Sequence, residues 1–145
     1  MKKLVFLAAI LATSCSQAEV SVFPDGLSHA EKLYYCSIVI EHVFEVSGGP
    51  DTEEDQIVID TMGRHYRYAF FVETKREDFS VKDRAKMHVE MKNHLYSVFE
   101  HFMREDDERG AYMFGEKITY SCSQLLSEEQ RQDLIYDLAT KIGLL

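Results

Sequence analysis

The chain carries six histidines, whose side chains are the ones best suited to proton transfer or metal binding near neutral pH. Glu90, His94 and His101 fall within roughly 80° of one another on a helix predicted between residues 80 and 105. His94 and His101 are about 10 Å apart along that helix, so sharing one ion requires a ligand from a second helix. We interpret this face as solvent-exposed. We predict no metal site and no cofactor, and keep these three residues as candidate ligands should a second helix contribute.

His65 and His88 lie on the apolar faces of two predicted helices. A histidine in that position is usually a core residue with one ring nitrogen hydrogen-bonded. If the two helices packed together, the two rings could meet and form a composite enzyme site. A lowered pKa for either imidazole, within a cleft, would favour that alternative.

Motifs that position a nucleophile or a phosphate are absent from the sequence. There is no G-x-S-x-G elbow, phosphate-binding glycine loop, H-E-x-x-H pair or calcium-loop pattern. Pairs of carboxylates are so frequent in this acidic chain that their spacing does not discriminate between functions. The sequence therefore predicts a protein that is not an enzyme.

The N-terminus has the pattern of an export signal. Two lysines precede a short apolar run, and small residues at Ser16 and Ala18 fit a cleavage site, which predicts a signal peptide over residues 1–18. Alternatively, Cys15 ends a sequence that resembles a bacterial lipobox and would then carry a lipid anchor. In an exported chain, Cys36 and Cys122 are expected to form a disulfide rather than stay as separate buried thiols.

The charge balance excludes one class of partner. Asp and Glu number 25 against 16 Lys and Arg, giving a net charge of −9. Such a surface repels phosphate backbones, so we expect no nucleic-acid partner. The apolar run at the N-terminus is also shorter than the roughly 20 residues of a membrane span. A protein partner, if there is one, is expected to be basic.

Hydrophobic periodicity predicts an all-α fold, a compact bundle of four to five helices joined by Cys36–Cys122. Residues 19–27 contain the turn signature Pro-Asp-Gly and are expected to form a flexible arm, followed by one helical domain over 28–145. The predicted helices cover residues 28 to about 47, 51 to about 72, 80–105, a shorter stretch around 118–125, and 127–142. Possible capping boxes at Ser28, Ser80 and Ser127 mark three of their starts.

The segment 105–116 is the candidate partner-binding loop. Two glycines interrupt the helical pattern there, and aromatic side chains stand beside carboxylates. Exposed aromatics anchor interfaces, and acids accelerate the approach of a basic protein. The alternative is that the aromatics fold back onto the core. The candidate residues are Glu105, Asp106, Asp107, Glu108, Tyr112 and Phe114.

Two resemblances add hypotheses. Residues 126–130, Leu-Ser-Glu-Glu-Gln, resemble the L-T-x-x-Q signature of small periplasmic helical chaperones and metal-stress proteins, with Ser in place of Thr. The layout of a signal, a helical body and one disulfide looks like that of type VI amidase immunity proteins, although no motif of that family is matched.

Together these features predict a small exported binding protein of the bacterial envelope, periplasmic or secreted. We expect a protein-directed inhibitor or immunity-like factor that occludes a basic partner. The alternatives are a periplasmic chaperone or metal-stress sensor and, as a third possibility, an enzyme with a composite site.

Overall fold

The computed structural model describes residues 22–46, 50–74 and 80–145, and within these ranges every regular element is a helix. The elements are α2 (His29–Val46), α3 (Glu53–Glu73), α4 (Val81–Arg104), α5 (Glu108–Leu125) and α6 (Glu128–Lys141). The predicted all-α bundle is confirmed. The predicted signal peptide and Cys15 lie outside the described residues. None of the helices in the described ranges is long and apolar enough to cross a membrane.

Side-chain caps set where several helices begin. The Ser28 backbone N–H donates to the Glu31 carboxylate (2.8 Å), and the Glu31 N–H donates to the Ser28 hydroxyl (3.2 Å). Ser127 and Gln130 make the same reciprocal pair before α6, and Ser80 caps α4. Each such cap contributes about 1 kcal/mol by satisfying N–H groups that lack a partner within the helix. The predicted starts of these helices are therefore confirmed.

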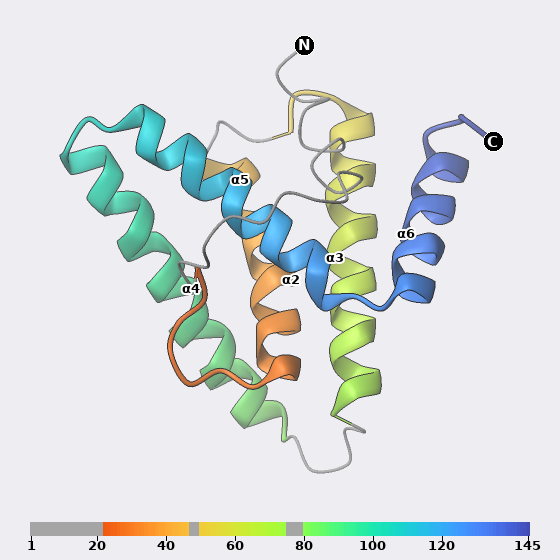
Figure 1. Ribbon diagram of the computed structural model, residues 1–145, viewed down its shortest axis with the longest axis horizontal. Helices are drawn as coiled ribbons and strands as arrows, with labels where there is room; N and C mark the ends of the chain where they lie inside the picture. The colour runs from red at the N-terminus through yellow and green to blue at the C-terminus, as the bar shows by residue number, and fades with distance from the viewer. Residues whose placement is uncertain (1–21, 47–49, 75–79) are drawn as a thin grey trace.

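Helix α2 is the centre of the bundle. It packs against α3, α4 and α5, and Figure 1 shows it between α3 and α4 with α5 crossing over it. Tyr35, Cys36, Ile38 and Val39 are therefore all buried, although they point in different directions around the helix. Helix α2 is apolar on more than one face. The Cys36–Cys122 disulfide is confirmed and joins the middle of α2 to α5.

The predicted loop over 105–116 is wrong, because α5 already begins at Glu108. Only three residues turn the chain between α4 and α5. Asp106 takes a left-handed conformation (φ 53°), and the Asp107 side chain accepts from the Gly110 N–H (2.7 Å). Gly110 and Gly115 lie inside the helix, where each costs about 1 kcal/mol relative to alanine. Tertiary contacts and the cap outweigh that local cost.

The buried face of α4 also differs from the predicted one. His88, which the sequence placed on the apolar face, is only partly buried, and the apolar residues Val81 and Met103 near the two ends of the helix are exposed. The buried row runs at i, i+4 spacing instead, and it places two methionines in the core. Its residues are Met87, Met91, Leu95 and Phe99.

Residues 22–27, the described part of the predicted flexible arm, pack against the body of the protein. Phe23 lies edge-on to Tyr35, with ring centroids 6.1 Å apart, and the Lys32 ammonium lies over the Phe23 ring. Val22 and Leu27 also contact the core. This segment therefore covers one side of α2, which differs from the loose arm that the turn signature suggested.

Candidate functional site

The turn between α4 and α5 forms an exposed acidic corner, which we define as residues 103–116. Figure 1 shows it at one end of the molecule, away from α3 and α6. Met103 and Tyr112 are 75% and 59% exposed, and Met113 is exposed as well. The four acids at 105–108 are exposed around them. Single exposed apolar side chains are normal on protein surfaces, whereas several of them rimmed by charged groups are typical of interaction sites, so this corner is a candidate interaction surface.

The structure assigns different tasks to the aromatic residues of the corner. Phe114 folds back, with its ring perpendicular to Phe99 (5.8 Å between centroids) and 5.9 Å from Phe102. It holds α5 against α4 and is not available to a partner, so the alternative of a ring packed on the core holds for Phe114. Tyr112 points to solvent, and a hydrogen bond to the Glu116 carboxylate raises its pKa.

The acids of the corner also divide into two groups. Asp107 is the N-cap of α5 and has a structural role. Glu105, Asp106 and Glu108 are exposed carboxylates. Two cations lie in the same segment: Arg104 is paired with Glu100 at 2.8 Å, and Arg109 is exposed beside Glu108. Residues 103–116 carry five acids against these two arginines, so the corner is net negative. The loop predicted for this region is wrong, and its role in binding a partner stays a prediction.

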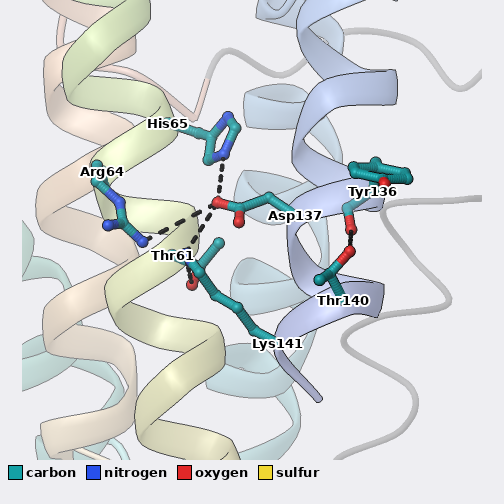
Figure 2. A network of polar contacts seen from close by, with 7 residues as sticks. All are labelled: Thr61, Arg64, His65, Tyr136, Asp137, Thr140 and Lys141. Carbon is teal, nitrogen blue, oxygen red and sulfur yellow. Dashed lines mark hydrogen bonds and ion pairs between the residues drawn. The ribbon is translucent and has the colours of Figure 1, made fainter. Parts of the chain in front are cut away.

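His65 belongs to a polar network between α3 and α6 (Figure 2). Its Nε2 lies 3.0 Å from Asp137 Oδ2, and the Lys141 ammonium donates to the same oxygen at 2.9 Å. Lys141 also donates to the Thr61 hydroxyl (3.3 Å), and Arg64 lies 4.0 Å from the Asp137 carboxylate. The hydrogen bonds from Lys141 and His65 lower the pKa of Asp137.

This network resembles a catalytic His–Asp pair only in composition. The Thr140 hydroxyl drawn in Figure 2 donates to the Tyr136 carbonyl of its own helix. The Thr61 hydroxyl belongs to a residue only 1% exposed and already accepts from Lys141. A nucleophile must reach its substrate, which this burial prevents. The network therefore joins the C-terminal helix to α3, next to the buried Leu134 and Leu138.

His88 has a different partner. Its Nδ1 lies 3.3 Å from the Tyr34 hydroxyl of α2, and burial lowers the pKa of the imidazole. Burial also raises the pKa of Tyr34. His65 and His88 thus pair with α6 and α2 respectively, and the structure does not join them in the composite site considered above.

The face with Glu90, His94 and His101 is divided as well. Glu90 and His94 line a pocket of about 390 Å³ between residues 24–27, the start of α2 and α4. His101 is exposed near the C-terminal end of α4, beside Phe102. Among the described residues, no three His, Cys, Asp or Glu side chains come together as a possible metal site. The same pocket is lined by Met87 and Met91, which the sequence prediction included neither in the apolar face of this helix nor among the candidate ligands.

The segment at 126–130 has a local structural explanation. Leu126 is buried, and Ser127 and Gln130 form the capping box of α6. A buried leucine followed by S-x-x-Q is what a helix start of this kind requires, so the resemblance to the chaperone signature carries no further weight.

Comparison with known proteins gives no assignment. No protein-family model matches the chain, and no curated protein or solved structure is significantly similar to it. Function must therefore be argued from the surface and the sites themselves.

Proposed function

We propose that this protein is an exported binding protein without catalysis of its own, which captures a basic protein through the acidic α4–α5 corner. The observation that carries the proposal is Tyr112, an exposed aromatic side chain one helical turn from both Glu108 and Glu116, in a segment that also exposes Met103 and Met113. Buried aromatic anchors supply much of the binding energy of protein interfaces. Carboxylates around such an anchor steer a basic surface toward it.

The rigidity of the corner supports the proposal. Phe114 packs α5 onto α4, and the Cys36–Cys122 disulfide joins the same helix to α2. A preorganised surface loses little conformational entropy on binding, so more of the contact energy is available as affinity. The disulfide also fits an oxidising compartment, where we place the protein as a periplasmic or secreted inhibitor or immunity-like factor that occludes its target.

The first test is capture from envelope and secreted fractions by the oxidised protein, at low and high salt, with mass spectrometry. We expect one stoichiometric basic protein whose capture weakens as salt rises, because screening removes the electrostatic attraction. A diffuse set of unfolded proteins would contradict the proposal and support the chaperone alternative. Capture that is insensitive to salt would contradict the acidic corner as the binding surface.

Matched variants then locate the contact on the corner. Tyr112→Ala is expected to weaken binding by at least about tenfold, as for an interface anchor. Tyr136→Ala is its control, because Tyr136 is 68% exposed on α6, far from the corner. Glu105→Lys is expected to slow association more at low than at high salt, whereas the same reversal at Asp133 leaves the rate unchanged. Asp107 is left intact because its substitution would remove the cap of α5.

A further inference from the structure

The pocket beside α4 holds a set of soft donors. Met87, Met91 and His94 all line it, and at 100° per residue they lie within roughly 60° of one another on the helix. Met87 and Met91 are 8% and 4% exposed, so their thioethers form the floor of the pocket. His94 is half-buried at the same wall.

Thioether sulfur and imidazole nitrogen are donors that favour one kind of metal. Methionine selects soft monovalent copper over zinc, calcium or magnesium, which prefer thiolate, imidazole or oxygen ligands. Glu31, Asp83 and Glu90 line the same pocket together with Lys86, whose ammonium lies 3.7 Å from the Glu90 carboxylate. Three acids against one lysine leave the lining net negative, which favours a bound cation. The donor set therefore distinguishes Cu(I) from the divalent ions.

The spacing allows the three donors to reach one ion. Met91 is a direct helical neighbour of both Met87 (i, i+4) and His94 (i, i+3), with about 5–6 Å between β-carbons in each pair. The outer two residues are about 10 Å apart along the axis, the same separation as His94 and His101. Unlike His94 and His101, this pair has a third donor between its members, the sulfur of Met91, and one of the two outer side chains, Met87, is long and flexible. An ion over Met91 lies within reach of both outer side chains.

A neighbouring group can orient the imidazole. The Tyr35 ring lies 6.0 Å from the His94 ring between centroids. Its buried hydroxyl has no hydrogen-bond partner among the described residues. Metal-bound histidines characteristically use their second nitrogen in a hydrogen bond that fixes the ring. The Tyr35 hydroxyl therefore lies near the imidazole of His94 and could accept or donate the hydrogen bond that a metal-bound histidine requires.

We propose that Met87, Met91 and His94 form a Cu(I)-binding site, with Tyr35 orienting the imidazole. The site lies in the N-terminal two thirds of α4, whereas the acidic corner begins at the C-terminal end of this helix. Metal binding by the protein alone requires no partner. Either proposal can therefore fail without the other.

The test is an anaerobic titration of the full chain with Cu(I) against the chromophoric chelator bicinchoninate, in a Cys15→Ser background. That substitution removes the one thiol outside the disulfide, and mass spectrometry verifies that Cys36–Cys122 stays oxidised, because free thiolates would bind Cu(I) themselves. We expect one equivalent of Cu(I) to be withdrawn from the chelator. X-ray absorption should show sulfur and nitrogen ligands together.

Substitutions identify the ligands without disturbing the core. Met91→Leu conserves volume, so the fold is expected to persist, and binding should be lost. His94→Gln should have the same effect, and Met87→Leu should weaken binding. The control is Met103→Leu, a change of the same chemistry at an exposed position on the same helix, which should leave binding intact. Circular dichroism checks that each variant is folded.

Three outcomes would overturn the proposal. The first is the absence of Cu(I) binding by the parent protein. The second is binding that survives Met91→Leu. The third is binding that zinc displaces and Glu90→Gln removes, because this would indicate a carboxylate–histidine site for a divalent ion instead of a thioether site.

Discussion

Removal of the Cys36–Cys122 disulfide is expected to destabilise the protein severely. The two cysteines are 86 positions apart, so the bond closes most of the described chain into one loop. The entropy that such a cross-link removes from the unfolded chain corresponds to about 4 to 5 kcal/mol. Since domains of this size are stable by about 5–15 kcal/mol, the reduced protein should lie near its unfolding midpoint or retain only a fraction of its stability.

Urea unfolding of the oxidised protein and of a Cys36→Ala/Cys122→Ala variant measures the difference. Both should carry Cys15→Ser, which prevents thiol exchange. Alanine is preferred to serine because both sites are buried, with exposures of 0% and 2%, and a hydroxyl there would lack a partner. Comparison with the chemically reduced parent separates cross-linking from packing. A loss below about 1 kcal/mol in both would refute the loop-closure argument.

Two further predictions concern α6 and α5. Asp137→Asn should lower the free energy of unfolding by about 1 kcal/mol at pH 7, whereas Asp133→Asn, one turn earlier, should change it by less than about 0.5 kcal/mol. Hydrogen bonds from Lys141 and His65 lower the folded-state pKa of Asp137 from 3.8, so its contribution is complete above pH 3.8 and is lost as the pH falls through that lowered pKa; an equal effect of Asp137→Asn at pH 2 and pH 7 would contradict this. Gly115→Ala should stabilise α5 by up to about 1 kcal/mol, because the added Cβ meets open space. Gly110→Ala should destabilise it in the same thermal-unfolding assay, since its Cβ would lie 2.0 Å from the capping carboxylate; two equal stabilisations would show that this cap can move aside.

Features encoded in a few neighbouring residues could be predicted from the sequence. The caps at Ser28 and Ser127 depend on side chains three positions apart, so their chemistry is visible without the fold. The disulfide could be predicted from the cysteine count together with the predicted export signal. The all-α class could be predicted because apolar residues recur every three to four positions over long stretches of the sequence.

Features decided by tertiary contact could not be predicted in this way. Gly110 reads as a helix breaker, but the structure places the Phe102 ring and the Asp107 carboxylate where its side chain would be, which makes glycine suitable inside α5. The burial of α2 on several sides depends on how many helices surround it, and its own periodicity does not contain that information. For the same reason the buried row of α4 passes through Met87 and Met91 rather than through His88.

The pocket beside α4 shows why methionine ligands are difficult to predict from a sequence. Methionine is an apolar residue with a weak thioether donor, so its spacing alone does not mark a ligand, and the sequence indicates only Glu90, His94 and His101 as candidates on this helix. The pocket retains two of these three and adds two thioethers, which changes the metal that the site favours from a divalent to a monovalent ion. At the corner the sequence indicates more residues than the fold leaves exposed for binding. Phe114 packs against α4 and Asp107 caps α5, so Tyr112 and the remaining carboxylates are the ones proposed to contact a partner. In both places the fold determines which side chains are free to act, and it does so by burying or capping their neighbours.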